Sequence, residues 1–382
     1  MSTSVYVHFP WCLQKCPYCD FASATIKRPE VPHAQYADAV LRELGWRRDD
    51  LGSRELASVF FGGGTPSLWD GSQLARVLEA IFAAFPRHAA DLEITVECNP
   101  SSLDPQRAAA LESAGVNRLS IGVQALDDAR LRYLGRLHDA DGALRAVEAA
   151  QRAVPRVSAD LMFGTPGQRA EQFLSELARI LELGLDHLSV YALTIEPDTQ
   201  FGELQRKGKL PLAKEDDYAD TFLAIERELG ARGFEHYEVS NYARPGQSSR
   251  HNQHYWRGGD YLGLGAAAVG CMTGGPGRAR RTRNQPKPDS YMRAQSLQEL
   301  LDYAEDLDAQ ALVREGLLLG LRTAEGLNVS RLRARSGVDP AQGRERALAR
   351  AAERGNLLRE PSHWRVPQAR WLHLDSIVAD LF

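Results

Sequence analysis

The chain has 382 residues, of which 43% are hydrophobic and 25% charged, and its formal net charge is −4. These values describe a globular protein long enough for more than one domain, and they exclude a global charge bias toward nucleic acid or anionic membranes. No basic and apolar leader precedes Val5, and no apolar stretch approaches the roughly 20 residues of a membrane span. We therefore expect a cytoplasmic protein. Its five cysteines predict metal or redox chemistry rather than disulfides.

Short apolar runs alternate with segments of helical periodicity through the first half of the chain. Helical spacing is clear at residues 73–85 and 170–184. Strands that alternate with helices predict a parallel sheet with right-handed crossovers. Six units are two short of a closed eight-unit barrel, so we expect an α/β fold with a partial (β/α)6 barrel. The expected strands are residues 5–9, 58–61, 92–97, 118–123, 157–163 and 187–193.

Polar and unusual residues follow these strands. A cysteine cluster follows the first strand and the sequence GGGTP (62–66) follows the second. Glu97 and Gln124 end the third and fourth, while Asp160 and Tyr191 lie in the fifth and sixth. Since the chemistry of such barrels sits at the carboxyl ends of the strands, we expect one face to collect these residues.

The cysteines Cys12, Cys16 and Cys19 have the spacing C-x3-C-x2-C. Three thiolates can hold three irons of a [4Fe–4S] cluster and leave the fourth iron open to a ligand. The alternative is a structural zinc site of Cys3His type, which usually draws on two C-x2-C pairs. Only one such pair exists here, because Cys98 and Cys271 are isolated. The spacing favours the cluster and leaves zinc open.

The cysteine spacing, with Tyr18 before the last cysteine and a glycine-rich turn after the second strand, resembles the radical S-adenosylmethionine (SAM) superfamily. FFGGGTPSL (60–68), SIGVQALDD (120–128) and YEVSNYARPG (237–246) are similar to its branch that contains oxygen-independent coproporphyrinogen III oxidase and the haem chaperone HemW. This resemblance implies a [4Fe–4S] cluster, SAM as cofactor and haem as cargo. The implied cluster ligands are Cys12, Cys16 and Cys19, and the implied SAM contacts are Tyr6, Tyr18, Gly63, Gly64, Thr65, Glu97, Gln124, Arg136, Asp160, Ala192 and Val269.

These residue types suit the implied roles. Glycines let the backbone approach a ligand, Glu97 and Asp160 could hold an ammonium or ribose hydroxyls, and Arg136 suits a carboxylate. Each has a simpler explanation as well: a glycine run is often a plain turn, the acids could be helix caps or ion-paired, and Arg136 could be a solvated cation.

Within the branch, the oxidase carries a fourth cysteine two residues after the third, where this chain has Phe21. The oxidase also has a longer segment before its first strand, and HNQHYW (251–256) resembles a hallmark of the chaperone. The resemblance thus implies a haem chaperone. The alternative is the oxidase itself, which converts coproporphyrinogen III to protoporphyrinogen IX by radical oxidative decarboxylation, and whether the chain is an enzyme stays open.

Two histidines of that motif, His251 and His254, are candidate residues next to the haem, since imidazole is a common axial ligand. Histidines beside Asn252, Tyr255 and Trp256 could equally make buried hydrogen bonds in a packed loop.

The composition of the sequence changes after the last predicted barrel strand. Residues 244–300 are rich in Gly, Pro and Arg, and we expect the basic run 278–287 to be a solvated loop, with phosphate, acidic partners or haem propionates as alternatives. From residue 302 the pattern is helical and then briefly extended, similar to the small winged-helix-like C-terminal domain of the same branch. The expected division is a barrel (1–235), a connecting region (236–301) and a C-terminal helical domain (302–382).

The implied partners are haem and acceptor haemoproteins, with a respiratory-chain or iron-storage protein as a candidate acceptor. No nucleic acid is expected, because the C-terminal segment mixes acids with its arginines. A radical RNA-modifying enzyme is the third alternative and is favoured only by the basic run. A homodimer and peripheral membrane association stay open.

Overall fold

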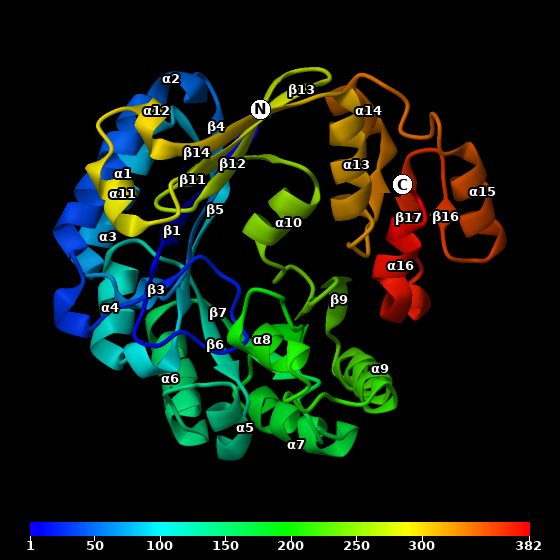
Figure 1. Cartoon of the computed structure of the whole chain (residues 1–382), viewed down its shortest axis with the longest axis horizontal. Helices are drawn as coiled ribbons and strands as arrows, with labels where there is room; N and C mark the ends of the chain where they lie inside the picture. The colour runs from blue at the N-terminus through cyan, green and yellow to red at the C-terminus, as the bar shows by residue number, and fades with distance from the viewer.

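Six parallel strands form the centre of the computed structural model, which describes residues 1–382. They lie side by side in chain order, and every pairing between them is parallel. All six strands predicted from the sequence are present, so the partial (β/α)6 barrel is confirmed (Figure 1). Their bounds are β1 (Ser2–Phe9), β4 (Glu55–Gly63), β5 (Arg87–Cys98), β6 (Arg118–Gln124), β7 (Arg156–Phe163) and β8 (His187–Ala192).

Amphipathic helices cover the outside of these strands. In α3 (Gly71–Ala84) the buried residues Leu74, Val77, Leu78 and Ile81 recur every three or four positions, and the Asp70 side chain caps the first turn. The other helices and 3-10 turns of this part are η1 (Arg28–Glu30), α1 (His33–Trp46), α2 (Arg48–Leu51), η2 (Pro66–Leu68), η3 (Pro100–Ser102), α4 (Pro105–Ser113), α5 (Asp128–Tyr133), α6 (Ala140–Ala153), α7 (Ala170–Leu181), α8 (Gln200–Arg206) and α9 (Glu215–Ala231).

The sheet continues beyond the barrel strands at both edges. Next to β8 lie β10 (Asn241–Ala243) and β9 (Glu235–Glu238), and next to β1 lies β11 (Asp260–Leu264). An antiparallel ribbon of β12 (Val269–Gly275), β13 (Arg278–Asn284) and β14 (Leu301–Leu307) follows β11. The helices α10 (Arg250–Trp256), α11 (Pro288–Arg293) and α12 (Leu297–Leu300) accompany this part, and β2 (Trp11–Cys12) pairs separately with β3 (Ala24–Thr25).

The ribbon corrects two expectations. The basic run 278–287 is largely strand β13 rather than a solvated loop, and residues 301–307 are strand rather than the start of a helical segment. The physical reason is charge pairing across the ribbon: Arg280 pairs with Asp306, Arg281 with Glu305 and Arg283 with Asp302. The acids that match the arginines follow about 20 residues later, so the run taken alone looks like an unpaired basic segment.

The C-terminal residues have a hydrophobic core of their own, built from residues between Val313 and Leu381. The three expected helices and the short extended pair are present; a third strand joins that pair in one small sheet, and a further helix ends the chain. The elements are α13 (Ala309–Gly320), β15 (Leu327–Asn328), α14 (Val329–Ser336), α15 (Glu345–Glu353), β16 (Leu358–Arg359), β17 (His363–Arg365), η4 (Gln368–His373) and α16 (Leu374–Ala379).

Helix α10 lies between the barrel and this C-terminal part. It contacts β4 and β11 on one side and α13 on the other, and Figure 1 shows it between the ribbon and α13. The open side of the partial barrel is therefore closed by α10, the ribbon and the C-terminal helices. No helix in the structure combines the length and apolar character needed to cross a bilayer.

Candidate cofactor and ligand site

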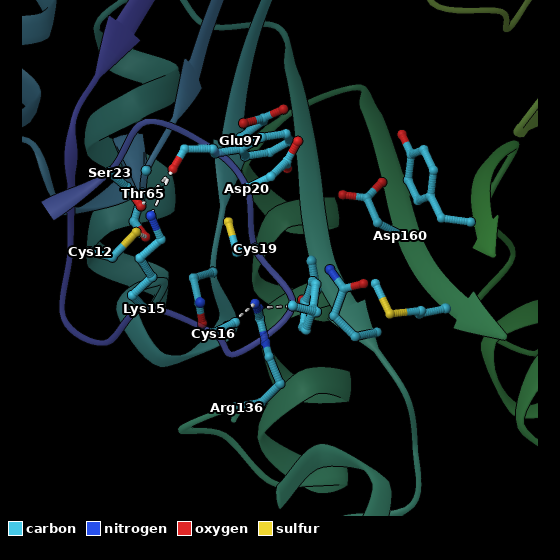
Figure 2. Close-up of a pocket in the computed structure, with 18 of the residues that line it drawn as sticks. Cys12, Lys15, Cys16, Cys19, Asp20, Ser23, Thr65, Glu97, Arg136 and Asp160 are labelled. Carbon is cyan, nitrogen blue, oxygen red and sulfur yellow. Dashed lines mark hydrogen bonds between the residues drawn. The ribbon is translucent and has the colours of Figure 1, made fainter. Parts of the chain in front are cut away.

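The loop after β1 carries the three clustered cysteines. Cys12, Cys16 and Cys19 are half-buried and not in disulfides. Thr65 Oγ1 donates a hydrogen bond to Cys12 Sγ at 3.3 Å, and Arg136 Nη1 donates one to Cys16 Sγ at 3.6 Å. Figure 2 shows the three thiols around one pocket together with both donors. Thr65, just after β4, and Arg136, in the loop between α5 and α6, therefore hold two of the thiols in position.

The thiol set fits an iron–sulfur cluster better than a single ion. Burial raises the pKa of the Cys12 thiol and raises the pKa of the Cys19 thiol to about 11, so a metal that binds these two thiols has to displace their protons. A structural zinc site needs four ligands around a single ion, whereas a cluster takes one thiolate on each of several irons.

The glycine run at the end of β4 holds the cysteine loop in place. Gly64 N donates to Phe9 O at 2.7 Å and Thr65 N donates to Trp11 O at 2.9 Å. A Cβ on Gly64 would lie 2.7 Å from Trp11 O, which is backbone and cannot move aside. Gly63 has φ +109°, a conformation that favours glycine. The run is thus needed where β4 and the cysteine loop approach each other.

Two half-buried carboxylates, Glu97 and Asp160, lie beside the thiols. Burial, and then the nearby Asp160, raise the pKa of Glu97 to about 8. Burial raises the pKa of Asp160 to about 6, although Ser120 Oγ donates to it at 3.0 Å. Gly63 N donates to Glu97 Oε2 at 3.2 Å. Desolvation raises both pKa values and the like charge of Asp160 adds to that of Glu97, so a cationic ligand group would favour ionisation of both acids.

Arg136 lies at the same pocket. Its Nη2 donates to Gly122 O at 2.8 Å, and its buried Nε has no partner in the protein. The guanidinium is thus only partly satisfied by the protein and can bind an anionic group.

Gln124 at the end of β6 has φ +68°, which is uncommon outside glycine and marks a sharp turn of the backbone at the pocket wall.

Most residues proposed from the sequence line this first cavity, which has a volume of about 320 Å³. Tyr6 and Val269 instead line a second, adjoining cavity of about 750 Å³, and so does His251. His254 lines neither. The expected residues brought together at the first cavity are Cys12, Cys16, Tyr18, Cys19, Gly63, Gly64, Thr65, Glu97, Gln124, Arg136, Asp160 and Ala192.

The second cavity extends from the barrel interior to the C-terminal helices. It shares Phe21, Gly63 and Glu97 with the first cavity, so the two adjoin. Aromatic side chains line much of it, and four of these are partly exposed at 37–55%. A cavity of this size, with aromatic and apolar side chains as well as charged ones in its wall, suits a large organic ligand that also carries polar groups. The exposed aromatic residues are Phe21, Tyr191, Tyr255 and Tyr303.

Several residues of the second cavity were missed by the sequence reasoning. Ser120 and Arg118 are polar residues inside the apolar run of β6, and that contrast was their available signal. Arg281 and Arg335 line the cavity from β13 and α14. Arg281 lies in the basic run 278–287, for which haem propionates are one alternative, whereas nothing in the sequence marks Arg335, because only the tertiary fold brings it to the barrel opening.

Comparison with known proteins agrees with this arrangement. Residues 6–180 match the Radical SAM superfamily and residues 307–373 match the HemN C-terminal domain. Heme chaperone HemW of Escherichia coli (strain K12) is 42% identical over 301 residues, which are 78% of each protein. Radical S-adenosyl methionine domain-containing protein 1, mitochondrial, of Mus musculus is 41% identical over 85% of this chain and 74% of that protein.

Among solved structures, coproporphyrinogen III oxidase (HemN) from Escherichia coli superposes with a TM-score of 0.82 at 23% identity. The superposition covers 100% of this chain and 90% of that one. This likeness establishes the shared fold, and the sequence relatives establish the family. The chain therefore belongs to the radical SAM superfamily and, within it, to the HemW family.

Proposed function

We propose that this chain is a haem chaperone that binds haem in the second cavity and hands it to acceptor haemoproteins. The observation that carries the proposal is a cavity of about 750 Å³ with a neutral histidine in its wall, next to the pocket of the three thiols. The names of the HemW relatives support haem as the cargo. The cluster would be held by Cys12, Cys16 and Cys19, and SAM would bind in the first cavity.

His251 is the better of the two candidate haem ligands. Ser58 Oγ donates its proton to Ser4 Oγ at 2.7 Å, so at 2.8 Å it accepts one from Nδ1–H of His251. The lone pair is then on Nε2, for which the protein supplies no hydrogen-bond partner. Burial lowers the pKa of His251 to about 3, so the ring is neutral at physiological pH. A neutral imidazole held through Nδ1–H is the form that binds iron.

His254 is in a different situation. Its Nε2 donates to Asp260 O at 2.8 Å, and its ring packs against Gly259, where a Cβ would lie 2.2 Å from Nε2. These contacts fit the simpler explanation of a packed, hydrogen-bonded histidine. We propose that His254 stabilises the end of α10 and does not contact haem.

The first cavity suits a ligand with an ammonium and a carboxylate group, as SAM has. Glu97 and Asp160 can bind the ammonium or hydroxyls, and Arg136, whose Nε lacks a partner, can bind the carboxylate. With a reduced cluster and SAM bound, such a site supplies one-electron cleavage of the sulfonium. Thr65 and Arg136 hold the thiols through their hydrogen bonds, and the glycines of β4 keep the loop close.

The test is a haem titration of the anaerobically reconstituted protein, followed by the Soret band. The His251→Ala variant should lose the Soret band position of the wild type and bind haem at least tenfold more weakly, whereas the matched His254→Ala variant should keep both. Equal spectra and affinities for wild type and His251→Ala would contradict the assignment of His251.

A second assay addresses the chaperone itself. The reconstituted protein receives reductant, SAM and coproporphyrinogen III, and the porphyrin products are separated by chromatography beside an active oxidase. We expect no doubly decarboxylated product, together with transfer of bound haem to an apo-haemoprotein. Appearance of that product would overturn the chaperone proposal in favour of the oxidase.

A further inference from the structure

The charges of the second cavity are unevenly satisfied. Three arginines line it: Arg118, Arg281 and Arg335. Arg118 is 4.0 Å from Glu93, and Arg281 pairs with Glu305 and Glu315. Arg335 has no carboxylate within ion-pair distance. One of the three cations in the wall therefore has no counter-charge from the protein.

The surroundings of Arg335 are built to hold a guanidinium, yet leave it unsatisfied. Its Nη2 is 3.8 Å from Cys271 Sγ, a weak acceptor, and its Nε is fully buried without a partner. A Cβ at Gly258 would lie 2.8 Å from Nη1, so this glycine leaves the space that the guanidinium occupies. A partly buried cation without an anion is costly. Such a residue is expected to bind an anionic group of a ligand.

We propose that Arg335 binds a carboxylate of the ligand in the second cavity, namely a propionate side chain of the tetrapyrrole. The inference rests on the proposed haem function and assigns its anion anchor. Arginine binds carboxylates in a planar, two-bonded geometry. The aromatic walls accept the flat apolar ring, and Arg335 fixes the edge that carries the acids.

The position of Arg335 has a structural consequence. It belongs to α14 in the C-terminal part, whereas His251 belongs to α10 against the barrel. A ligand that contacts both side chains bridges the barrel and the C-terminal helices. The C-terminal part then selects for tetrapyrroles with free carboxylates, and its contact with the ligand must break when the haem is released.

The test compares haem with its dimethyl ester, which keeps the iron and the ring but lacks the carboxylates. Binding of both is measured by Soret titration in the full-length wild type, in Arg335→Gln and in Arg333→Gln. Arg333 is the matched control, because it lies on the same helix, is 57% exposed and pairs with Asp339. Arg335→Lys retains the charge, and thermal melting checks that each variant is folded.

We expect the wild type to prefer haem over the ester about tenfold or more, which is about 1.4 kcal/mol. Arg335→Gln should lose most of that preference, because it should bind haem more weakly and the ester as tightly as the wild type does. Arg335→Lys should retain part of the preference. Arg333→Gln should retain all of it. An unchanged preference in Arg335→Gln overturns the inference while haem binding still supports the proposed function. Absence of haem binding by the wild type would overturn both. Weaker SAM binding in Arg335→Gln with unchanged haem binding would assign the arginine to a different carboxylate and overturn the inference.

Discussion

Glu93 is the residue whose substitution tests the link between the barrel and α10. It lies in β5 with its side chain fully buried, and its Oε1 accepts from Ser249 Oγ at 3.2 Å and from His251 N at 3.0 Å. Its Oε2 accepts from Arg250 N at 3.1 Å and from Arg156 Nη1 at 2.6 Å. One carboxylate thus caps the first turn of the helix that carries His251.

The substitution Glu93→Gln keeps the shape of the side chain, removes its negative charge and replaces one acceptor oxygen by an NH2 donor. That donor would face either backbone N–H groups or a guanidinium, and Arg118 would remain buried without its nearby anion. Breaking a buried ion pair by removing one partner costs about 3–5 kcal/mol. Since domains are stable by about 5–15 kcal/mol, this loss is a large fraction of the total. We also expect weaker haem binding, because the backbone N–H groups that open α10 lose their charged acceptor, while the side chain of Ser249 still caps the helix.

Urea unfolding of the metal-free protein measures the stability change, with the exposed Glu112→Gln as the control within about 0.5 kcal/mol of wild type. Burial raises the pKa of Glu93, but Arg118 and Arg156 outweigh it and the net pKa is lowered. A lowered pKa in the folded state contributes stability above the unfolded value of about 4.3, and that contribution is lost as pH falls. The difference in unfolding free energy between wild type and Glu93→Gln should therefore be largest near pH 7 and become smaller below about pH 4. A loss under 1 kcal/mol at pH 7 would refute the reasoning.

Two further substitutions probe the first cavity. The raised pKa of Glu97, about 8, means that the folded state keeps a proton that the unfolded chain has lost, so wild-type stability should fall as pH rises from about 4.5 to 8. Glu97→Gln should remove the part of that fall that belongs to Glu97 in urea unfolding of the metal-free protein, while Asp160, whose pKa is also raised, keeps its own part. Parallel pH profiles for wild type and variant would contradict this. Gly64→Ala places a Cβ against Trp11 O and should cost about 1–3 kcal/mol and lower the iron bound on reconstitution. The control is Gly45→Ala on α1, where an added Cβ meets open space, and it should be neutral or stabilising by about 0.5–1 kcal/mol. Full iron loading of Gly64→Ala would contradict the prediction, because it would show that the cysteine loop can shift.

The barrel was predictable because its elements are periodic and locally specified. Six apolar runs gave six strands, and the rule that parallel strands present their carboxyl ends on one face placed Glu97, Gln124 and Asp160 near the cysteine loop. The ribbon was not predictable in this way. Strand β13 is stabilised by acids on β14, and no local pattern in the arginine run reveals that pairing.

The second cavity was the least predictable part of the site. Its walls come from the barrel, α10, the ribbon and the C-terminal helices, which are far apart in the sequence. His251 and His254 lie three positions apart on one helix and look equivalent in the sequence. Tertiary contacts separate them, because Ser58 holds the ring of one beside the cavity and the carbonyl of Asp260 holds the ring of the other away from it.

Phe21 occupies the position at which the resemblance implies a fourth cysteine in the oxidase. It lines both cavities and is 55% exposed, so it stands where the thiol pocket meets the larger cavity. A cysteine at that position would present a fourth thiol to any ligand in the larger cavity, in reach of redox or metal chemistry. A phenyl ring presents instead an apolar face that can stack on a flat ligand without reacting with it. We therefore expect Phe21 to favour holding the proposed tetrapyrrole ligand over transforming it.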